Sequence, residues 1–168
     1  IVRGMNYKNV FLTFVLSFLT WLLLNGSLDS DILISGLVLS LLISLLFCRK
    51  CDVMQYVNLS PKGFMYAFAY VFAFSWALIK SNLDVAFRVI KPSLPINPGI
   101  VKVKTKLKTP IGKMMLANSI TLTPGTITVD IKDDTLYIHW IDVTSTDIEE
   151  ATKNIVVSFE KYLEVMYG

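Results

Sequence analysis

Two long uncharged runs near the N-terminus constrain this chain more than any other feature. They cover residues 10–24 and 32–47 and contain no Asp, Glu, Lys, Arg or His. As helices they would each be about 22–24 Å long, slightly short of the ~30 Å hydrocarbon core of a bilayer. Between them, Gly26 can end one helix, and Ser30 or Asp31 can begin the next. We therefore expect a helical hairpin that crosses a membrane twice.

The composition also indicates a membrane protein. Hydrophobic residues make up 54% of the 168 residues and charged residues 17%, with a mean hydropathy of +0.57. Soluble domains have about 25% charged residues, and a soluble fold of this size lacks the interior to bury so much apolar surface. The apolar composition therefore predicts lipid as a partner, and the net charge of only +3 argues against nucleic acid.

A third apolar segment is longer than the first two. Ser60 and Pro61 are residue types that begin helices, and Pro92 prevents continuation, so we expect one helix over 61–91. Its first half, 63–79, is uncharged and rich in aromatic residues, and its second half is amphipathic. We expect the helix to leave the hydrocarbon where these halves meet. None of the three uncharged stretches offers an ionisable group for an ion or proton pathway.

The composition changes after Pro92, and the remaining residues predict a small α+β domain. Strict alternation over 100–108 indicates a half-buried strand, and Thr146 with Glu149 forms the pattern of a helix-capping box. The expected order β-α-β-β-α places the helices on one face of a sheet. The expected elements are a strand at 100–108, a helix at 111–119, strands at 127–131 and 136–143, and a last helix from 146. The predicted domains are therefore membrane helices in 1–91 and a soluble domain in 92–168.

Four lysines occupy one face of the first expected strand: Lys102, Lys104, Lys106 and Lys108. Three interpretations stay open. The row can be a solvated face that protects a sheet edge. It can attract anionic lipid headgroups, or it can form salt bridges with a partner.

No motif in the sequence predicts catalysis. Cys48 and Cys51 have CxxC spacing, but zinc needs four ligands and no second pair exists. His139 lies in an alternating strand, where a structural or surface role is usual. We therefore expect no enzyme activity, no cofactor and no metal, with the cysteines at a membrane border.

Four short motifs, in order, resemble one family. They are Asn82-Leu83-Asp84-Val85-Ala86 with Lys91-Pro92, Pro98-Gly99-Ile100, Leu116-Ala117-Asn118-Ser119-Ile120-Thr121-Leu122-Thr123-Pro124-Gly125-Thr126, and Thr135-Leu136-Tyr137-Ile138-His139-Trp140. The chain resembles the E subunit of Mrp-type multisubunit Na+/H+ antiporters over nearly its whole length. The same subunit type occurs in archaeal membrane-bound hydrogenase or sulfur-reducing complexes with an Mrp-like module.

The resemblance implies a non-catalytic accessory subunit of a cation/proton antiporter module, with other subunits as partners. The larger complex can itself be a redox-driven, ion-pumping enzyme. The alternative is a stand-alone membrane-anchored binding or scaffold module without a transport role. The family implies a cytoplasmic side for the soluble part.

Two sets of residues are candidate sites. The first is the family signature, which we expect to be a fold-defining corner or a contact for a neighbouring subunit. Its members are Asn118, Ser119, Thr121, Leu122, Thr123, Pro124, Gly125 and Thr126. The second is the small-residue stripe Gly36, Ser40 and Ser44, spaced four apart, which we expect to pack against a neighbouring helix.

The charges around the hairpin predict a multi-pass protein of the cell membrane with both hairpin ends in the cytoplasm. Lys and Arg lie before the first run and after the second, whereas the turn between them carries Asp29 and Asp31. A full crossing by 63–79 would then place the last domain outside, against the family expectation. Two or three crossings both stay open, and we expect a cytoplasmic domain.

Overall fold

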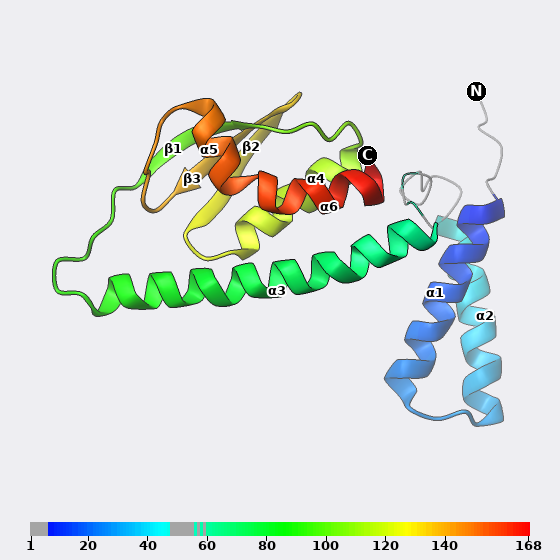
Figure 1. The fold of residues 1–168 in the computed structure, drawn as a ribbon. Helices are drawn as coiled ribbons and strands as arrows, with labels where there is room; N and C mark the ends of the chain where they lie inside the picture. The colour runs from blue at the N-terminus through cyan, green and yellow to red at the C-terminus, as the bar shows by residue number, and fades with distance from the viewer. Residues whose placement is uncertain (1–6, 48–55, 57, 59) are drawn as a thin grey trace. The chain divides into compact units, whose positions relative to one another are not determined.

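The computed structural model describes residues 7–47, 56, 58 and 60–168. Contacts divide the chain into two compact units, residues 1–55 and residues 56–168, and each is described by itself. The first unit is helical, and the second combines a long helix with a small α+β arrangement (Figure 1). The predicted class, a helical N-terminal part followed by a small α+β part, is confirmed at this level.

The first unit is a hairpin of α1 (Tyr7–Asn25) and α2 (Ser30–Phe47). Gly26 adopts a φ of +62°, a left-handed conformation that glycine tolerates, and its N–H donates to the carbonyl of Leu22 at 2.9 Å. The Trp21 indole of α1 donates to the Ile32 carbonyl of α2 at 3.0 Å. Gly26 therefore ends the first helix as the sequence predicts.

The third helix, α3, runs from Pro61 to Ile90 and belongs to the second unit. The Ser60 hydroxyl accepts a hydrogen bond from the Gly63 N–H at 3.1 Å, so the predicted start is confirmed. Figure 1 shows α3 as a single long rod beside the α+β elements. Contacts therefore separate the units at 55/56, whereas the sequence prediction divides membrane from soluble residues at 91/92.

The α+β elements form a three-stranded antiparallel sheet with helices on one face. The central strand is β3, so the spatial order is β1-β3-β2. A β-bulge between Thr128 and Asp130 interrupts the pairing of β2 with β3. In chain order the elements are β1 (Gly99–Lys104), α4 (Pro110–Leu122), β2 (Thr126–Lys132), β3 (Thr135–Trp140), α5 (Ile148–Ile155) and α6 (Val157–Tyr167).

Several expected boundaries are wrong, each for a local reason. The helix expected to end at residue 119 continues to Leu122, where the Thr123 N–H still reaches the Ser119 carbonyl at 3.3 Å. The last helix is capped by Asp147, whose carboxylate accepts from two backbone N–H groups, and not by Thr146. It is then interrupted at Val156, which divides it into α5 and α6.

The first strand is also shorter than expected, since its ladder ends at Lys104. Beyond it, the Thr105 N–H donates to the Asp134 carbonyl at 2.9 Å, and the Lys106 N–H donates to the buried Glu160 carboxylate at 2.7 Å. The alternation of burial nevertheless continues through Leu107, as the sequence pattern predicts.

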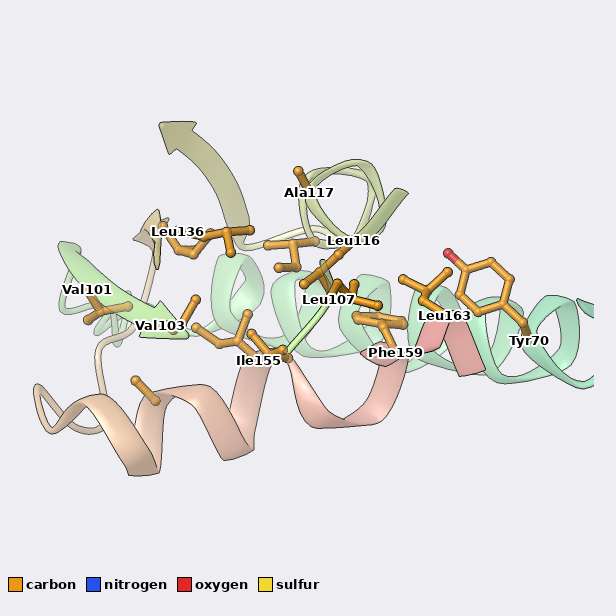
Figure 2. Packing of buried hydrophobic residues seen from close by; sticks show 14 residues of the cluster. Tyr70, Val101, Val103, Leu107, Leu116, Ala117, Leu136, Ile155, Phe159 and Leu163 are labelled. Carbon is orange, nitrogen blue, oxygen red and sulfur yellow. The ribbon is translucent and has the colours of Figure 1, made fainter. Parts of the chain in front are cut away.

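The core of the second unit joins the inner sheet face to four helices. Val103, Leu136 and Ile138 of the sheet are fully buried, as are Leu116 of α4 and Leu163 of α6. Figure 2 shows Tyr70 of α3 beside Leu163, at one end of this cluster. The long helix is therefore part of the same hydrophobic core as the sheet.

Candidate functional site

The signature residues form the corner between α4 and β2. The Thr123 hydroxyl donates to the Ile120 carbonyl at 2.8 Å, and the Thr126 hydroxyl donates to the same carbonyl at 2.7 Å. The Thr121 hydroxyl accepts from the Thr128 N–H at 3.1 Å. These bonds satisfy backbone groups that the bend removes from the helix and the strand. The threonines therefore hold the corner together.

Gly125 is required by the backbone at this corner. Its φ is +95°, and a Cβ on it would lie 3.1 Å from the Ile141 side chain. Its carbonyl accepts from the Ile141 N–H at 2.9 Å, which ties the corner to the segment after β3. A side chain at this position is therefore disfavoured by both conformation and space.

Ser119 connects the signature to α3. Its hydroxyl is buried, donates to the Met115 carbonyl at 2.6 Å and shares a hydrogen bond with the hydroxyl of Tyr70. Because the single Ser119 proton is used on Met115, the Tyr70 hydroxyl is the donor in the second bond. This buried pair holds the first third of α3 against α4.

Arg88 makes a second polar connection, from α3 to the segments before β1 and after β3. Its guanidinium donates to Asp84 at 2.7 Å, to Asp142 at 2.6 Å and to the Pro95 carbonyl at 2.8 Å. Hydrogen bonds to Asp84 and then to Asp142 raise the pKa of Arg88 above its ordinary value. The arginine therefore joins the end of α3 to Pro95, between α3 and β1, and to Asp142, in the segment after β3.

A hollow of about 680 Å³ lies beside this arginine within the second unit. Pro124 contributes one wall from the signature, Trp140 comes from β3, and Lys80 and Lys161 come from α3 and α6. The hollow therefore combines aromatic and cationic groups with the family signature on its border.

The opposite side of α4 is exposed. Met114, Asn118 and Leu122 are spaced four residues apart and share one exposed face, on which Leu122 is 62% exposed and Met114 is 50% exposed. We call these three residues the α4 ridge. The signature is thus divided into an inward part that stabilises the corner and an outward part that is available for contact.

The small-residue stripe lies on the face of α2 that packs within the hairpin. Gly36, Ser40 and Ser44 are the buried residues of α2. A Cβ on Gly36 would approach the Trp21 side chain of α1 to 2.5 Å, so glycine permits this close contact. The stripe therefore packs on a helix of the same chain, and a further contact with another subunit stays a prediction.

The four strand lysines are exposed, and one of them forms an ion pair. The Lys108 ammonium lies 3.2 Å from the Asp134 carboxylate, and the Lys113 ammonium lies 2.9 Å from the other oxygen of the same carboxylate. Hydrogen bonds from Lys113 and then Lys108 lower the pKa of Asp134 below its usual range. This cluster joins the β2–β3 hairpin to α4 and to the segment after β1.

Metal and redox chemistry find no support in the described parts of the chain. Over residues 7–47, 56, 58 and 60–168, no three His, Cys, Asp or Glu side chains gather as a metal site requires. Cys48 and Cys51 lie outside the described residues. The expected absence of cofactor and metal stays a prediction.

Sequence reasoning missed three residues that organise the site: Tyr70, Asp142 and Glu160. Tyr70 and Asp142 meet partners far along the chain, and Glu160 is a buried carboxylate that accepts from the Thr105 hydroxyl at 2.5 Å. The spacing of Asp84 and Arg88, four residues apart on a helix, was the one local signal that could have located the arginine.

The fold and the site define a membrane protein in which a helical hairpin precedes a small α+β unit. The family model described as "Na+/H+ ion antiporter subunit" matches residues 14–166. The chain belongs to this family.

Two bacterial relatives and one solved structure support this assignment. The chain is 37% identical to the Na(+)/H(+) antiporter E subunit of Bacillus subtilis over 158 residues, covering 93% of each chain. It is 35% identical to the Na(+)/H(+) antiporter E1 subunit of Staphylococcus haemolyticus, covering 90% of this chain and 92% of the relative. A chain in the structure of the membrane-bound sulfane sulfur reductase, an archaeal respiratory membrane complex, is 47% identical, with a TM-score of 0.83, covering 94% of this chain and 98% of that chain.

Proposed function

We propose that this chain is a non-catalytic accessory subunit of an Mrp-type cation/proton antiporter module in a large membrane complex. The observation that carries the proposal is family membership over residues 14–166, together with relatives matched over nearly their full length. The subunit supports assembly and Na+/H+ exchange, while its own uncharged membrane runs provide no ion pathway.

We further propose that the host is a respiratory complex. The chain of the archaeal sulfane sulfur reductase is 47% identical over nearly its full length, whereas antiporter E subunits are 35–37% identical over nearly their full length and 45% identical over 86 residues of one relative. A respiratory host predicts that redox subunits purify with this chain, whereas a host made only of antiporter subunits predicts none.

Affinity purification of the tagged full chain from native membranes tests both proposals. We expect a large multi-protein complex whose visible absorption shows iron–sulfur or other redox centres. Recovery of the chain alone would favour the stand-alone binding module. The purified chain in sealed vesicles should give no Na+/H+ exchange, and robust dissipation of a pH gradient would contradict the accessory role.

We propose that the second unit lies on the cytoplasmic side. The basic residues around the hairpin and the acidic turn with Asp29 and Asp31 favour cytoplasmic hairpin ends, and the row of lysines at 102–108 and the family expectation favour a cytoplasmic second unit. In this arrangement, the helices that contact the membrane lie within residues 1–91, and residues 92–168 lie in water. A single cysteine replaces either Ser27 or Asp133 in a chain that lacks Cys48 and Cys51. A membrane-impermeant label added to intact cells should modify position 27 and leave position 133 unmodified. Outside labelling of position 133 would overturn the orientation.

We propose that the α4 ridge contacts a neighbouring subunit, while the inward signature residues stabilise the fold. Leu122→Ser should lower the yield of the complex without changing the stability of the chain, because Leu122 is exposed. Gly125→Ala should lower both the yield of the complex and the stability of the chain, because a side chain at this position strains the corner between α4 and β2. Asp130→Asn, on exposed β2, is the matched surface control. An unchanged yield with Leu122→Ser would show that the ridge is not an interface.

A further inference from the structure

The outer face of α3 is apolar along its whole length and uncovered within the second unit. Its large apolar side chains are between 53% and 78% exposed. They are Phe64, Met65, Phe68, Val71, Phe72, Trp76, Ile79, Leu83, Phe87, Val89 and Ile90. The spacing from Phe68 through Phe72, Trp76 and Ile79 to Leu83 follows the helical repeat, so these side chains form one continuous face.

The inner face of α3 contacts the same unit near its start, around Tyr70 and near its end, and its second half lines the hollow beside Arg88. Beside its start, the Asn58 N–H donates to the Met166 carbonyl at 2.9 Å. In its first third Tyr70 bonds Ser119, and Arg88 near its end bonds Asp142. These contacts extend over a helix of 30 residues, which is about 45 Å long.

This packing is incompatible with a helix that crosses a bilayer. A crossing would carry the attached α+β elements, with exposed side chains such as Lys153 and Lys161, into hydrocarbon. Each Lys, Arg or Asp side chain at the centre of a membrane is strongly disfavoured. The length and apolarity of α3 suffice for a span, but its neighbours do not permit one.

The charges beside the apolar face match a lipid surface. Lys62, Lys80 and Lys91 are exposed and share one flank of the helix, because their spacings of 18 and 11 residues are close to whole turns. Trp76 and the phenylalanines are typical of helices at the boundary between headgroups and acyl chains. A row of lysines along one edge of an apolar helix face matches the phosphates that border the acyl chains of an anionic bilayer.

The chain also holds α3 near a membrane. A hairpin with two uncharged runs precedes it, and residues 48–60 connect α2 to α3. The covalent connection raises the local concentration of bilayer around α3, which adds to the affinity of an amphipathic helix.

We propose that α3 lies flat in the surface of an anionic lipid bilayer. Its apolar face enters the boundary between headgroups and acyl chains, and Lys62, Lys80 and Lys91 bind the lipid phosphates. The α+β elements rest on the side of α3 that faces the water. This arrangement permits both ends of the hairpin and the second unit to share one side of the membrane.

Depth measurements on the full chain test the proposal. A single cysteine replaces Phe68, Trp76, Leu83 or Phe87 in a chain with Cys48→Ser and Cys51→Ser, and each cysteine carries a spin label. The labelled chain is placed in vesicles of phosphatidylcholine and phosphatidylglycerol. Relative accessibility to oxygen and to a nickel chelate should give the same shallow depth at all four sites, about 5–10 Å. Labels at Leu39 of α2 and at Asp133 provide deep and aqueous references.

Cross-linking within the assembled complex identifies what covers the face. Benzoylphenylalanine replaces Phe72, with Ile100 on the outer sheet face as the control position. We expect phospholipid adducts from position 72 and none from position 100. Changing Lys62, Lys80 and Lys91 to glutamine should lower the fraction of anionic phospholipid among the cross-linked lipids at least twofold. The same change at Lys102, Lys104 and Lys106 should leave that fraction unchanged.

Four results would overturn the proposal. A depth that increases to the bilayer centre and decreases again would show a crossing helix. Water-like accessibility at all sites would show that α3 does not contact lipid. Cross-links from position 72 to another subunit would show a protein partner, and an unchanged anionic share would remove the lysines from lipid binding. These results do not depend on which complex contains the chain.

Discussion

The helices α2 and α3 are both long and apolar enough to cross a membrane, yet their surroundings differ. In α2 only the small residues Gly36, Ser40 and Ser44 are buried, and large apolar side chains are exposed around the rest of the helix. In α3 the buried side chain of Tyr70 belongs to a core that contains a sheet, and Phe74 and Ala77 pack against that core. Length and apolarity therefore set the affinity of a helix for lipid, while packing decides how the helix can meet it.

The contact faces of the two helices also use different side chains. On α2, small residues permit the backbone to approach Trp21 of α1 closely. On α3, the aromatic rings of Tyr70 and Phe74 contact α6, with ring centroids of Phe74 and Phe159 6.2 Å apart. Small residues suit helix pairs in lipid, whereas large aromatic rings fill the core of a globular unit.

The largest difference is expected when a charge enters each helix. Leu39→Arg at the middle of α2 should make the free energy of membrane insertion less favourable by about 2.5–3.5 kcal/mol, because a crossing helix places the arginine in hydrocarbon. Phe72→Arg on the outer face of α3 should cost no more than about 1 kcal/mol, because a charge near the interface reaches water. An insertion assay with the full chain measures both. Equal losses would remove the distinction between the helices.

A bulky residue in the small-residue stripe should disturb the hairpin and spare the second unit. Gly36→Leu places atoms where Trp21 and Phe18 lie, and such overpacking costs about 1–3 kcal/mol. We expect weaker assembly of the complex with membrane insertion intact. Val38→Leu, on the exposed side of α2, is the control. The reporters are complex yield and thermal unfolding of the full chain in detergent, and unchanged values would show that the contact is unimportant.

Loosening α3 from α4 should have a smaller effect that is confined to the second unit. Tyr70→Phe and Ser119→Ala each remove the buried hydroxyl pair and should each cost about 1 kcal/mol. Together they should cost less than the sum, because both remove one shared bond. Hydrogen exchange of the α3 amides in the full chain should accelerate. Full additivity of the two free-energy losses would contradict the coupling.

The smallest expected effect is the pH dependence from Asp134. Because Lys113 and Lys108 lower its pKa in the folded state, the carboxylate stabilises the fold above its usual pKa. That stabilisation is lost as the pH falls through the lowered value. Asp134→Asn should flatten the acid limb of the stability curve, as should high salt, because the group is exposed to solvent. Glu149→Gln at the exposed start of α5 is the control, and an unchanged acid limb in Asp134→Asn would exclude the cluster as its cause.

Local chemistry explains which features could be predicted from the sequence. Gly26 ends α1, Ser60 begins α3, and the alternation around Val101 and Val103 marks the buried face of β1, all as expected. The family motifs likewise consist of neighbouring residues, and membership is confirmed. Each of these signals depends on residues a few positions apart, where turn geometry, capping and side-chain periodicity act directly.

The amino-acid sequence alone was enough to predict the hairpin, the extent of α3 and the family. Only the tertiary structure decided the strand order β1-β3-β2, the pairing of Arg88 with Asp142, and which face of α3 is covered. Arg88 and Asp142 are 54 residues apart, and Tyr70 and Ser119 are 49 apart, so no local pattern relates them. An apolar helix has the same composition whether lipid or protein covers it, and the difference exists only once distant residues have packed against one of its faces.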